Sequence, residues 1–166
     1  GDQNVISCKS GNSGWMLRSS GNVIQFYIND GNWTGCQTSS LELNRWYHVA
    51  ATYQKGGGIA LYLDGKKVGS SSCGTLQVTP NADLQAGTAP SYSDRYMRGY
   101  IQDLSLWKDV RTAEEVAADV NCGFSGTEDG LNAYWPLNLN LGTSITDKTG
   151  NHTVNLVDVV WENPEE

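Results

Sequence analysis

The chain has 166 residues and a formal net charge of -7 at pH 7. This length is that of one domain, large enough to bury a core without metal or disulfide crosslinks. The negative charge argues against nucleic acid and anionic membrane surfaces as partners, because both select basic patches. No apolar run approaches the ~20 residues that a transmembrane helix needs, so we expect no membrane insertion.

The composition favours an all-β fold. The chain contains 19 glycines, 6 tryptophans and 8 tyrosines, but only 2 phenylalanines and 2 methionines. Such a composition is typical of many short strands joined by tight turns. No internal repeat, linker or low-complexity tract is visible, so we expect residues 1–166 to form a single domain.

The first part of the chain predicts consecutive antiparallel strands. Residues 3–9 form a predicted strand that ends at a Gly- and Asn-rich turn. Residues 15–18 and 23–28 flank the turn formers Ser20-Gly21-Asn22, which predicts a hairpin. The next return strand is expected at residues 33–39.

The segment Arg45 to Ser71 predicts three strands and both of their turns. Residues 46–53 alternate with the two-residue period of a strand. A run of three glycines interrupts the pattern, and residues 59–63 resume it. Asp64-Gly65 is typical of a type I′ turn, so residues 66–69 should return as a third antiparallel strand.

The second half predicts shorter strands and one helix. Strands are expected at residues 76–78, 84–87, 100–108, 133–137 and 153–161. The apolar residues Ile101, Leu104 and Leu106 do not share one parity, which predicts a β-bulge near Gln102-Asp103. The segment Thr112 to Glu115 has a capping-box pattern, so we expect a helix at about 113–120.

Several stretches resemble one known family. They are WYHVAATY and LYLDGKKVGS within residues 46–70, GYIQDLSLWKDVRTAEEV at 99–116, and GLNAYWPLNLNLGTSITDKTGN at 130–151. These stretches are similar to laminin-G-like and pentraxin-like modules of the concanavalin A-like lectin/glucanase jelly-roll superfamily. The resemblance implies an antiparallel two-sheet jelly-roll sandwich with one short helix. It leaves the ligand open, since the superfamily includes lectins, adhesion modules and glycan-cleaving enzymes.

The resemblance also implies a piece of a larger exported protein, either secreted or at the cell surface. Relatives usually place further strands before the equivalent of Val5-Ile6-Ser7, so we expect N-terminal strands to be missing. A sheet left short exposes backbone amides that invite pairing with another strand. We therefore expect either that the tail enters a sheet or that two copies form a strand-paired homodimer.

The cysteines Cys8, Cys36, Cys73 and Cys122 include no Cys-x-x-Cys pair, so a zinc site is not expected. Four cysteines allow three disulfide pairings, and the sequence does not choose among them. Cys36 and Cys73 both follow strands of the central region, so we favour a Cys36–Cys73 bridge. The alternative is that all four are ordinary free cysteines.

Catalysis is not expected. A retaining glycosidase needs two carboxyl groups ~5 Å apart across the scissile bond. Here Glu114-Glu115 lies on the predicted helix, Asp103 is alone in its strand, and Glu128-Asp129 sits in a Gly-flanked loop. His48 lies in the WYHVA strand without a Ser or Cys nucleophile motif, and we expect it to make a structural hydrogen bond.

Calcium is the candidate cofactor. It takes about six or more oxygen ligands, from carboxylates and carbonyls that converge from loops. Asp94 and Asp147 stand in predicted turns, and relatives bind calcium at the rim, so we take both as candidate metal ligands. The alternative is that they are turn formers, with Asp147 fixing its own turn.

A sugar site needs exposed aromatic residues on loops, because the C–H face of a sugar ring stacks on Trp or Tyr. The candidate residues are Trp33, at a predicted hairpin tip, and Tyr92, Asp94, Arg95 and Tyr96, in the loop 88–98. The tyrosines would stack on a sugar, Arg95 would donate to hydroxyls or a carboxylate, and Asp94 would accept a hydroxyl or hold calcium. The alternative is that Tyr96 packs under the loop and the others are solvated.

These patterns predict a non-catalytic carbohydrate-binding or adhesion module whose partner is a glycan or glycoprotein. The alternative from another class is a structural or protein-interaction spacer module. A glycoside-hydrolase-like fragment is the third interpretation.

Overall fold

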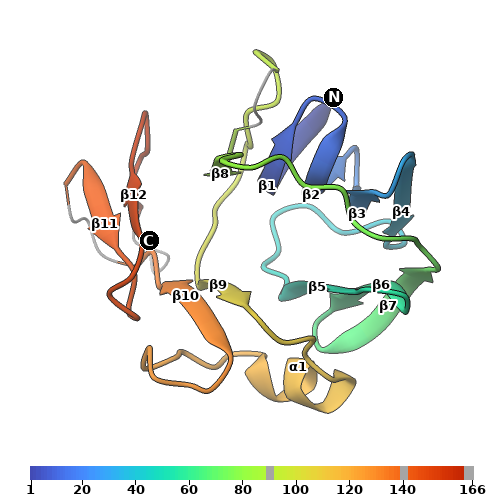
Figure 1. Ribbon diagram of the computed structural model, residues 1–166. Helices are drawn as coiled ribbons and strands as arrows, with labels where there is room; N and C mark the ends of the chain where they lie inside the picture. The colour runs from blue at the N-terminus through green and yellow to red at the C-terminus, as the bar shows by residue number, and fades with distance from the viewer. Residues whose placement is uncertain (89–91, 139–141, 163–166) are drawn as a thin grey trace. The chain divides into compact units, whose positions relative to one another are not determined.

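The computed structural model describes residues 1–88, 92–138 and 142–162. The chain forms two compact units, Gly1–Gly99 with Thr112–Val120 and Tyr100–Arg111 with Asn121–Glu166. Figure 1 shows the elements, which are β1 (Asp2–Ser10), β2 (Ser13–Ser20), β3 (Val23–Asn29), β4 (Trp33–Gln37), β5 (Val49–Gln54), β6 (Gly58–Leu63), β7 (Lys66–Ser71), β8 (Leu84–Ala86), β9 (Leu104–Trp107), α1 (Ala113–Asp119), β10 (Leu131–Trp135), β11 (Ser144–Thr146) and β12 (Thr153–Asn155). The predicted all-β class with one short helix is confirmed. None of the helical structure in the described ranges has the length and apolar character needed to cross a membrane.

The first four strands and β8 form an antiparallel sheet in the order β4-β3-β2-β1-β8. The turn at Gly21-Asn22 joins β2 to β3, and Gly21 has a φ of 57°, which favours glycine. Alternation then gives the sheet two faces, because Phe26 and Ile28 are buried on one side while Gln25 and Tyr27 point to the other. We call the apolar side the inner face and the opposite side the outer face.

A β-bulge in β1 determines which of its residues reach the outer face. The pairing of β1 with β2 shifts between Asn4 and Ile6, so Val5 is an extra residue. A shift of one residue reverses the face on which all later side chains lie. The bulge therefore brings Asn4 to the same face as Ser7 and Lys9.

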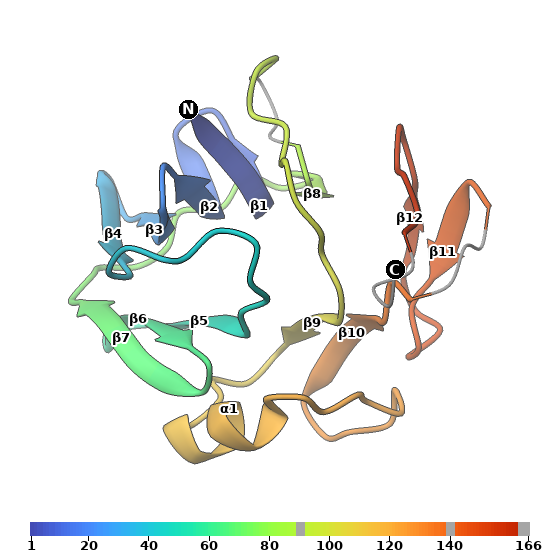
Figure 2. The same ribbon diagram turned by 180° about the vertical axis from the view of Figure 1, so that it is seen from behind.

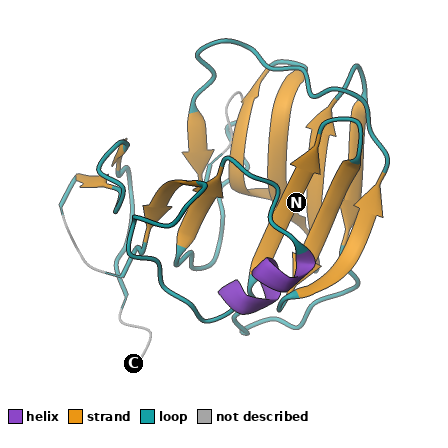
Figure 3. Ribbon diagram, turned by 60° about the horizontal axis from the view of Figure 1, so that its bottom comes forward, coloured by secondary structure: helices purple, strands orange, loops and turns teal. Residues whose placement is uncertain are grey.

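Strands β5, β6 and β7 form a second antiparallel sheet with β6 in the middle. Asp64 and Gly65 have φ values of 48° and 76°, which confirms the predicted type I′ turn between β6 and β7. Helix α1 covers one face of this sheet, where Val116 packs with Ala60 and Tyr62 (Figure 3).

Helix α1 begins with the predicted capping box. The Thr112 hydroxyl accepts the amide of Glu115 at 3.2 Å, and the Glu115 carboxylate accepts the amide of Thr112 at 2.8 Å. A Cβ at Gly65 would meet Ala117, so the turn glycine also allows the helix to approach the β6–β7 turn.

The inner face of the five-stranded sheet packs against the three-stranded sheet. Cys36 of β4 lies against Gly69 of β7. Leu61, which pairs with Gly69, is completely buried, as is Ile28 of β3. These residues form the core of an antiparallel sandwich whose two layers can be followed in Figures 1 and 2. The predicted sandwich is confirmed.

The second unit contains two sheets of two strands each, β9 with β10 and β11 with β12. The rings of Trp107 and Tyr134 both pack edge to face on Phe124, with centroids 5.2 and 5.1 Å apart. Strand β10 pairs with β9, so the tail does enter a sheet, as expected for one of the two outcomes. β12 ends at Asn155, which makes the last strand shorter than predicted.

Three local predictions are wrong. No strand forms at residues 76–78. The backbone of Gln77 instead bridges two strands: its amide donates to the Asn29 carbonyl at 2.8 Å, and its carbonyl accepts the Gly14 amide at 2.7 Å. The expected bulge near residues 102–103 does not form, because Asp103 has a positive φ and lies just before β9. The bulge in the pairing of β9 with β10 lies on β10. Predicted strand 46–53 begins only at Val49.

Candidate functional site

The outer face of the five-stranded sheet carries the polar and aromatic residues of its strands. Residues two apart in a strand share a face, and paired residues of neighbouring strands lie side by side. By this register the outer-face residues include Asp2, Asn4, Ser7 and Lys9 of β1, Met16 and Arg18 of β2, Gln25 and Tyr27 of β3, and Trp33, Gly35 and Gln37 of β4. Side chains from four strands are thus gathered on one surface.

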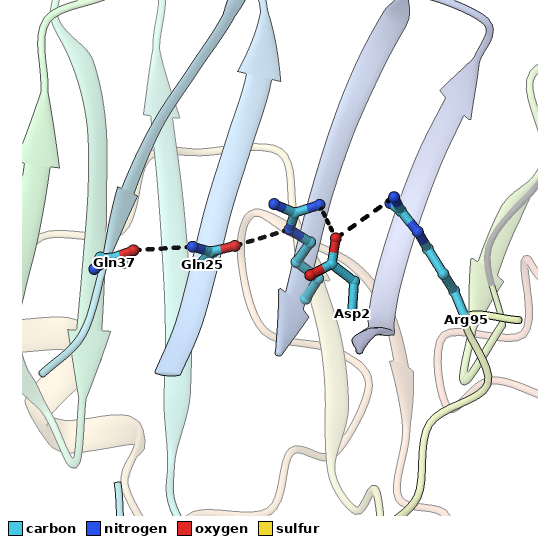
Figure 4. A network of polar contacts seen from close by, with 5 residues as sticks. Asp2, Gln25, Gln37 and Arg95 are labelled. Atoms are coloured by element: carbon cyan, nitrogen blue, oxygen red, sulfur yellow. Dashed lines mark hydrogen bonds and ion pairs between the residues drawn. The ribbon is translucent and has the colours of Figure 1, made fainter. Parts of the chain in front are cut away.

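Five residues make a continuous chain of polar contacts, which we call the polar row (Figure 4). Gln25 donates to Gln37 at 2.9 Å and accepts from Arg18 Nε at 2.9 Å. Arg18 and Arg95 then share Oδ2 of Asp2, at 2.6 and 3.5 Å. The polar row crosses β4, β3, β2 and β1 and ends in the loop after β8.

Asp2 is held in its ionised form. The hydrogen bond from the Ser20 hydroxyl, together with the charges of Arg18 and Arg95, lowers the pKa of Asp2 and outweighs the partial burial that would raise it. One carboxylate therefore serves two guanidinium groups. The polar row keeps a net positive charge.

Tyr27 lies over the backbone of the neighbouring strand. A Cβ at Gly35 would meet the ring carbons of Tyr27, so the ring covers the glycine with which Tyr27 pairs. The Arg18 guanidinium lies 5.0 Å from the centroid of the same ring, within the range of a cation–π contact. The glycine at position 35 is what permits this ring position.

Lys9, Trp33, Tyr92 and Arg95 form a second group, which we call the cation–aromatic cluster. The Nζ of Lys9 lies 4.9 Å from the Tyr92 ring centroid and 5.9 Å from the Trp33 ring centroid. The Arg95 guanidinium lies 3.7 Å from the Tyr92 centroid. All three distances are within the range in which a cation is attracted to an aromatic ring. Lys9 itself is only 4% exposed.

Backbone and side-chain bonds tie the loop 88–98 to β1. The amide of Asn4 donates to the carbonyl of Arg95 at 3.2 Å, and the Asn4 side chain donates to the carbonyl of Thr88. Asn4 is buried, so these bonds are shielded from water. They hold the loop beside the outer face. Residues 89–91 of the predicted loop lie outside the described part of the chain.

The structure brings together three of the five predicted ligand-binding residues, Trp33, Tyr92 and Arg95. Asp94 and Tyr96 belong to the same loop and are exposed, but they make no hydrogen bond, ion pair or ring contact with the described residues. Tyr96 is 61% exposed, so the part of the alternative that packs Tyr96 under the loop is wrong. A role for Asp94 and Tyr96 in binding stays a prediction.

Asp147, the second candidate metal ligand, belongs to the second unit and is engaged by its own chain. Its two oxygens accept the amides of Tyr134, Thr149, Asn151 and His152 at 2.8 to 3.2 Å. Burial alone would raise its pKa, but the hydrogen bond from the Thr149 hydroxyl, together with those from the backbone amides, prevails and lowers the pKa to about 2. This is the turn-fixing role. In the described ranges, no three His, Cys, Asp or Glu side chains are grouped so as to hold a metal ion.

The favoured Cys36–Cys73 disulfide is not formed. Cys36 lies beside Gly69, and Cys73 follows Gly69 by four residues of mostly extended chain. Four extended residues span about 13 Å, whereas a disulfide joins Cα atoms less than about 7 Å apart. The sequence indicated that both cysteines lie near strands, but it did not show that Cys73 lies four residues beyond the position that faces Cys36.

His48 is bonded through its backbone. Its amide donates to the Asp64 carboxylate at 3.0 Å, and its carbonyl accepts the Asp64 amide at 2.8 Å. Burial lowers the pKa of the imidazole, and its Nδ1 is buried with no partner among the described residues. The expected structural hydrogen bond is therefore made by the main chain, not by the ring.

Sequence reasoning missed Lys9, Asp2, Arg18, Gln25 and Gln37. A signal for four of them existed, because Lys9, Arg18, Gln25 and Gln37 are polar residues in predicted strands. Asp2 lies just before the predicted strand 3–9. The bulge at Val5 obscured it for β1. Only the register shows that these residues converge with the predicted Trp33, Tyr92 and Arg95.

The fold and the family can be compared with known proteins. No curated protein matches the chain. In structure the chain is similar to the crystal structure of a "putative carbohydrate binding protein" from Bacteroides ovatus ATCC 8483, with a TM-score of 0.73 and 23% identity over 95% of this chain and 50% of that one. It is also similar to an S-layer domain-containing protein (residues 221–444) from Clostridium thermocellum ATCC 27405, with a TM-score of 0.42 and 20% identity over 73% of this chain and 64% of that one.

The chain spans half the length of the Bacteroides protein, and at this identity the likeness shows the fold alone. The family comparison is more direct. A family model described as the concanavalin A-like lectin/glucanases superfamily matches residues 1–117, which include the whole five-stranded sheet and the cation–aromatic cluster. The chain belongs to the concanavalin A-like lectin/glucanase superfamily.

Proposed function

We propose that this chain is a non-catalytic carbohydrate-binding module of an exported protein. The observation that carries the proposal is the cation–aromatic cluster, in which Trp33 and Tyr92 come together beside the polar row. The superfamily fold supports it, and so does the likeness to a structure named for carbohydrate binding. The glycan would lie on the outer face of the five-stranded sheet.

The outer face has the chemistry that sugars require. Aromatic rings supply flat apolar surface for the C–H face of a sugar, and amides and guanidinium groups donate to its hydroxyls. Trp33, Tyr92 and Tyr27 would supply the rings. Gln25 and Gln37 would supply amide donors and acceptors from the polar row.

The same face argues for binding without hydrolysis. Among the outer-face residues named above, Asp2 is the one carboxylate. Its oxygen is shared by Arg18 and Arg95, which holds it ionised and unsuited to act as a general acid. A glycosidase uses two carboxyl groups with separate roles. Binding is therefore the function that this arrangement supports best.

The experiment is a glycan array followed by calorimetry on the best glycan. We expect the affinity of the double variant Trp33→Ala, Tyr92→Ala for the glycan to fall by at least about tenfold. The reason is that stacking of a sugar on an aromatic ring contributes on the order of 1 kcal/mol or more. The control is Trp46→Ala, which removes a 54% exposed tryptophan from outside the five-stranded sheet. Equal affinity of the double variant and the wild type, or no binding to any glycan, would overturn the proposal.

Calcium at Asp94 remains part of the proposal. Asp94 is exposed in the loop that carries Tyr92 and Arg95, so a calcium ion there would sit beside the proposed glycan. The same binding measurements with and without a chelator test this. Calcium at Asp94 is supported if the chelator lowers the glycan affinity of the wild type but not that of Asp94→Asn. Equal affinity of the wild type with and without chelator would contradict calcium at Asp94.

A protein-interaction module is the second candidate function, favoured by one observation. Leu43 and Trp46, which lie before β5, are 73% and 54% exposed. Exposed large apolar side chains close in sequence are typical of contact surfaces. A strand-paired homodimer would be one form of such contact, and sedimentation at two concentrations would reveal it.

A further inference from the structure

We infer that the glycan bound by this module is acidic, with carboxylate or sulfate groups, and that Lys9 is the residue that recognises the negative charge. The inference rests on the proposed function and adds the chemical class of the ligand. Neither Lys9 nor a preference for charged sugars follows from the fold of the superfamily.

The first argument is that Lys9 is nearly covered yet lacks a counter-ion. It is 4% exposed, and its Nζ is approached by the rings of Trp33 and Tyr92. Lys9 takes part in none of the ion pairs of the described residues, which include Arg18–Asp2 and Arg95–Asp2 on the same face. A covered ammonium without a carboxylate has lost hydration that nothing charged replaces.

The second argument is the charge balance around Lys9. Arg18 and Arg95 both depend on the single carboxylate of Asp2. Asp94, next to Arg95 in sequence, forms no ion pair with either arginine in the described structure. Three cations therefore face one carboxylate on the outer face, in a chain whose net charge is -7. A positive site on an acidic protein is not a consequence of composition.

The third argument is that rings and cations are interleaved. Lys9 lies between two aromatic rings, Arg95 stacks on one of them, and Arg18 lies over Tyr27. A sugar ring stacked on Trp33 or Tyr92 would place a substituent acid group next to Lys9. Charge-assisted bonds from an ammonium or a guanidinium are roughly twice as strong as neutral ones. A uronate or sulfated sugar would use both components of the site, whereas a neutral sugar would use only the rings and amides.

Single-stranded nucleic acid also combines stacked rings with negative charge. The net charge of -7 disfavours it, because a polyanion meets long-range repulsion from the rest of the chain. A short acidic oligosaccharide carries fewer charges and is repelled less. We therefore favour the acidic glycan.

The test is calorimetry of the whole chain with four probes: a neutral galactan oligosaccharide, an oligogalacturonate and a sulfated galactan oligosaccharide of equal length, and oligothymidine. We expect the wild type to bind at least one acidic oligosaccharide about tenfold more tightly than the neutral one, the gain of one charge-assisted bond. The preference should shrink with added salt. The two acidic probes distinguish carboxylate from sulfate recognition.

The variant is Lys9→Met, which keeps the length of the apolar stem and removes the charge. We expect it to lose about tenfold in affinity for the acidic probe and less than about twofold for the neutral probe. The matched control is Lys55→Met, which removes the same charge from the exposed β5–β6 turn and should change neither affinity. If Lys9→Met does not fold, Arg95→Gln replaces it and should reduce the same preference.

The outcomes separate the two proposals. Equal binding of neutral and acidic oligosaccharides by the wild type would overturn the acidic-glycan inference while leaving the proposed function standing. A preference for the acidic probe that survives in Lys9→Met would overturn the role of Lys9. Tighter binding of oligothymidine than of every oligosaccharide would overturn the inference in favour of nucleic acid. No binding of any oligosaccharide, here or on the array, would overturn both.

Discussion

Asp147 and Lys9 are each 4% exposed, but their charges differ in the partners that the chain supplies. The carboxylate of Asp147 accepts four backbone amides, from Tyr134, Thr149, Asn151 and His152. The ammonium of Lys9 faces two aromatic rings and pairs with no carboxylate of the described residues. A charge that its own chain satisfies serves folding, whereas a charge that the chain leaves unpaired is available to a ligand.

The first way to test this contrast is to remove Asp147. In Asp147→Ala four backbone amides lose their acceptor, and we expect the free energy of unfolding to fall by about 3 kcal/mol. Thermal and denaturant unfolding measure it. Asp147→Asn, which keeps one acceptor oxygen, should lose less. A change below about 0.5 kcal/mol in the alanine variant, typical of an ordinary surface position, would remove the assignment of Asp147 to folding.

The second prediction concerns pH. The pKa of Asp147 is lowered to about 2, so its ionised form stabilises the fold above the ordinary pKa of about 4, and this contribution is lost as the pH falls towards 2. We expect the difference in unfolding free energy between wild type and Asp147→Asn to be constant above about pH 5 and to shrink by about 2 kcal/mol by pH 2. A difference that is independent of pH over this range would contradict the lowered pKa.

The third prediction tests the other side of the contrast, the outer face. In Gly35→Ala the added methyl group would meet the ring of Tyr27, which must move. We expect a loss of about 1 kcal/mol in stability and weaker glycan binding. The control is the same change in a Tyr27→Ala background, where the ring is absent and the cost should disappear. An equal cost in both backgrounds would show that Tyr27 does not lie over Gly35.

The contrast also explains what could be predicted from the sequence. The partners of Asp147 include Thr149, Asn151 and His152, which lie within five residues of it, so local turn chemistry already indicated its structural role. The capping box of α1 and the type I′ turn at Asp64-Gly65 are local in the same sense, and both were predicted. Patterns that involve neighbours in sequence can be read without a structure.

The cation–aromatic cluster is not local. Lys9, Trp33 and Tyr92 come from β1, β4 and a loop, and only strand order and register bring them together. The aromatic residues were predicted because a sugar site needs exposed aromatic residues on loops, but a lysine at the end of a strand is ordinary. The bulge at Val5 further hid which residues of β1 share a face. The failed Cys36–Cys73 disulfide has the same cause, since it too depended on positions along different strands.

The smallest expected effect on stability is that of Lys9→Met, and it tests whether the charge of Lys9 serves folding or is available to a ligand. If Lys9 served folding, Lys9→Met would destabilise the chain as Asp147→Ala does. Because its ammonium has no carboxylate partner and methionine keeps most of the apolar stem, we expect the melting temperature to stay within about 2 °C of the wild type or to rise. Replacing a desolvated charge by an apolar group of similar size is often neutral or stabilising.

The control is Lys9→Ala, which also removes the apolar stem of this 4% exposed side chain. It should cost about 1 kcal/mol, because long charged side chains stabilise through their apolar part as well as through their charge. Differential scanning calorimetry of the three proteins in one buffer compares them. Unchanged stability in Lys9→Met together with a loss in Lys9→Ala would show that the stem belongs to the fold and the ammonium does not. A melting temperature in Lys9→Met that falls as far as in Lys9→Ala would show that the charge itself is structural, and the outer face would then have no unpaired cation to offer a ligand.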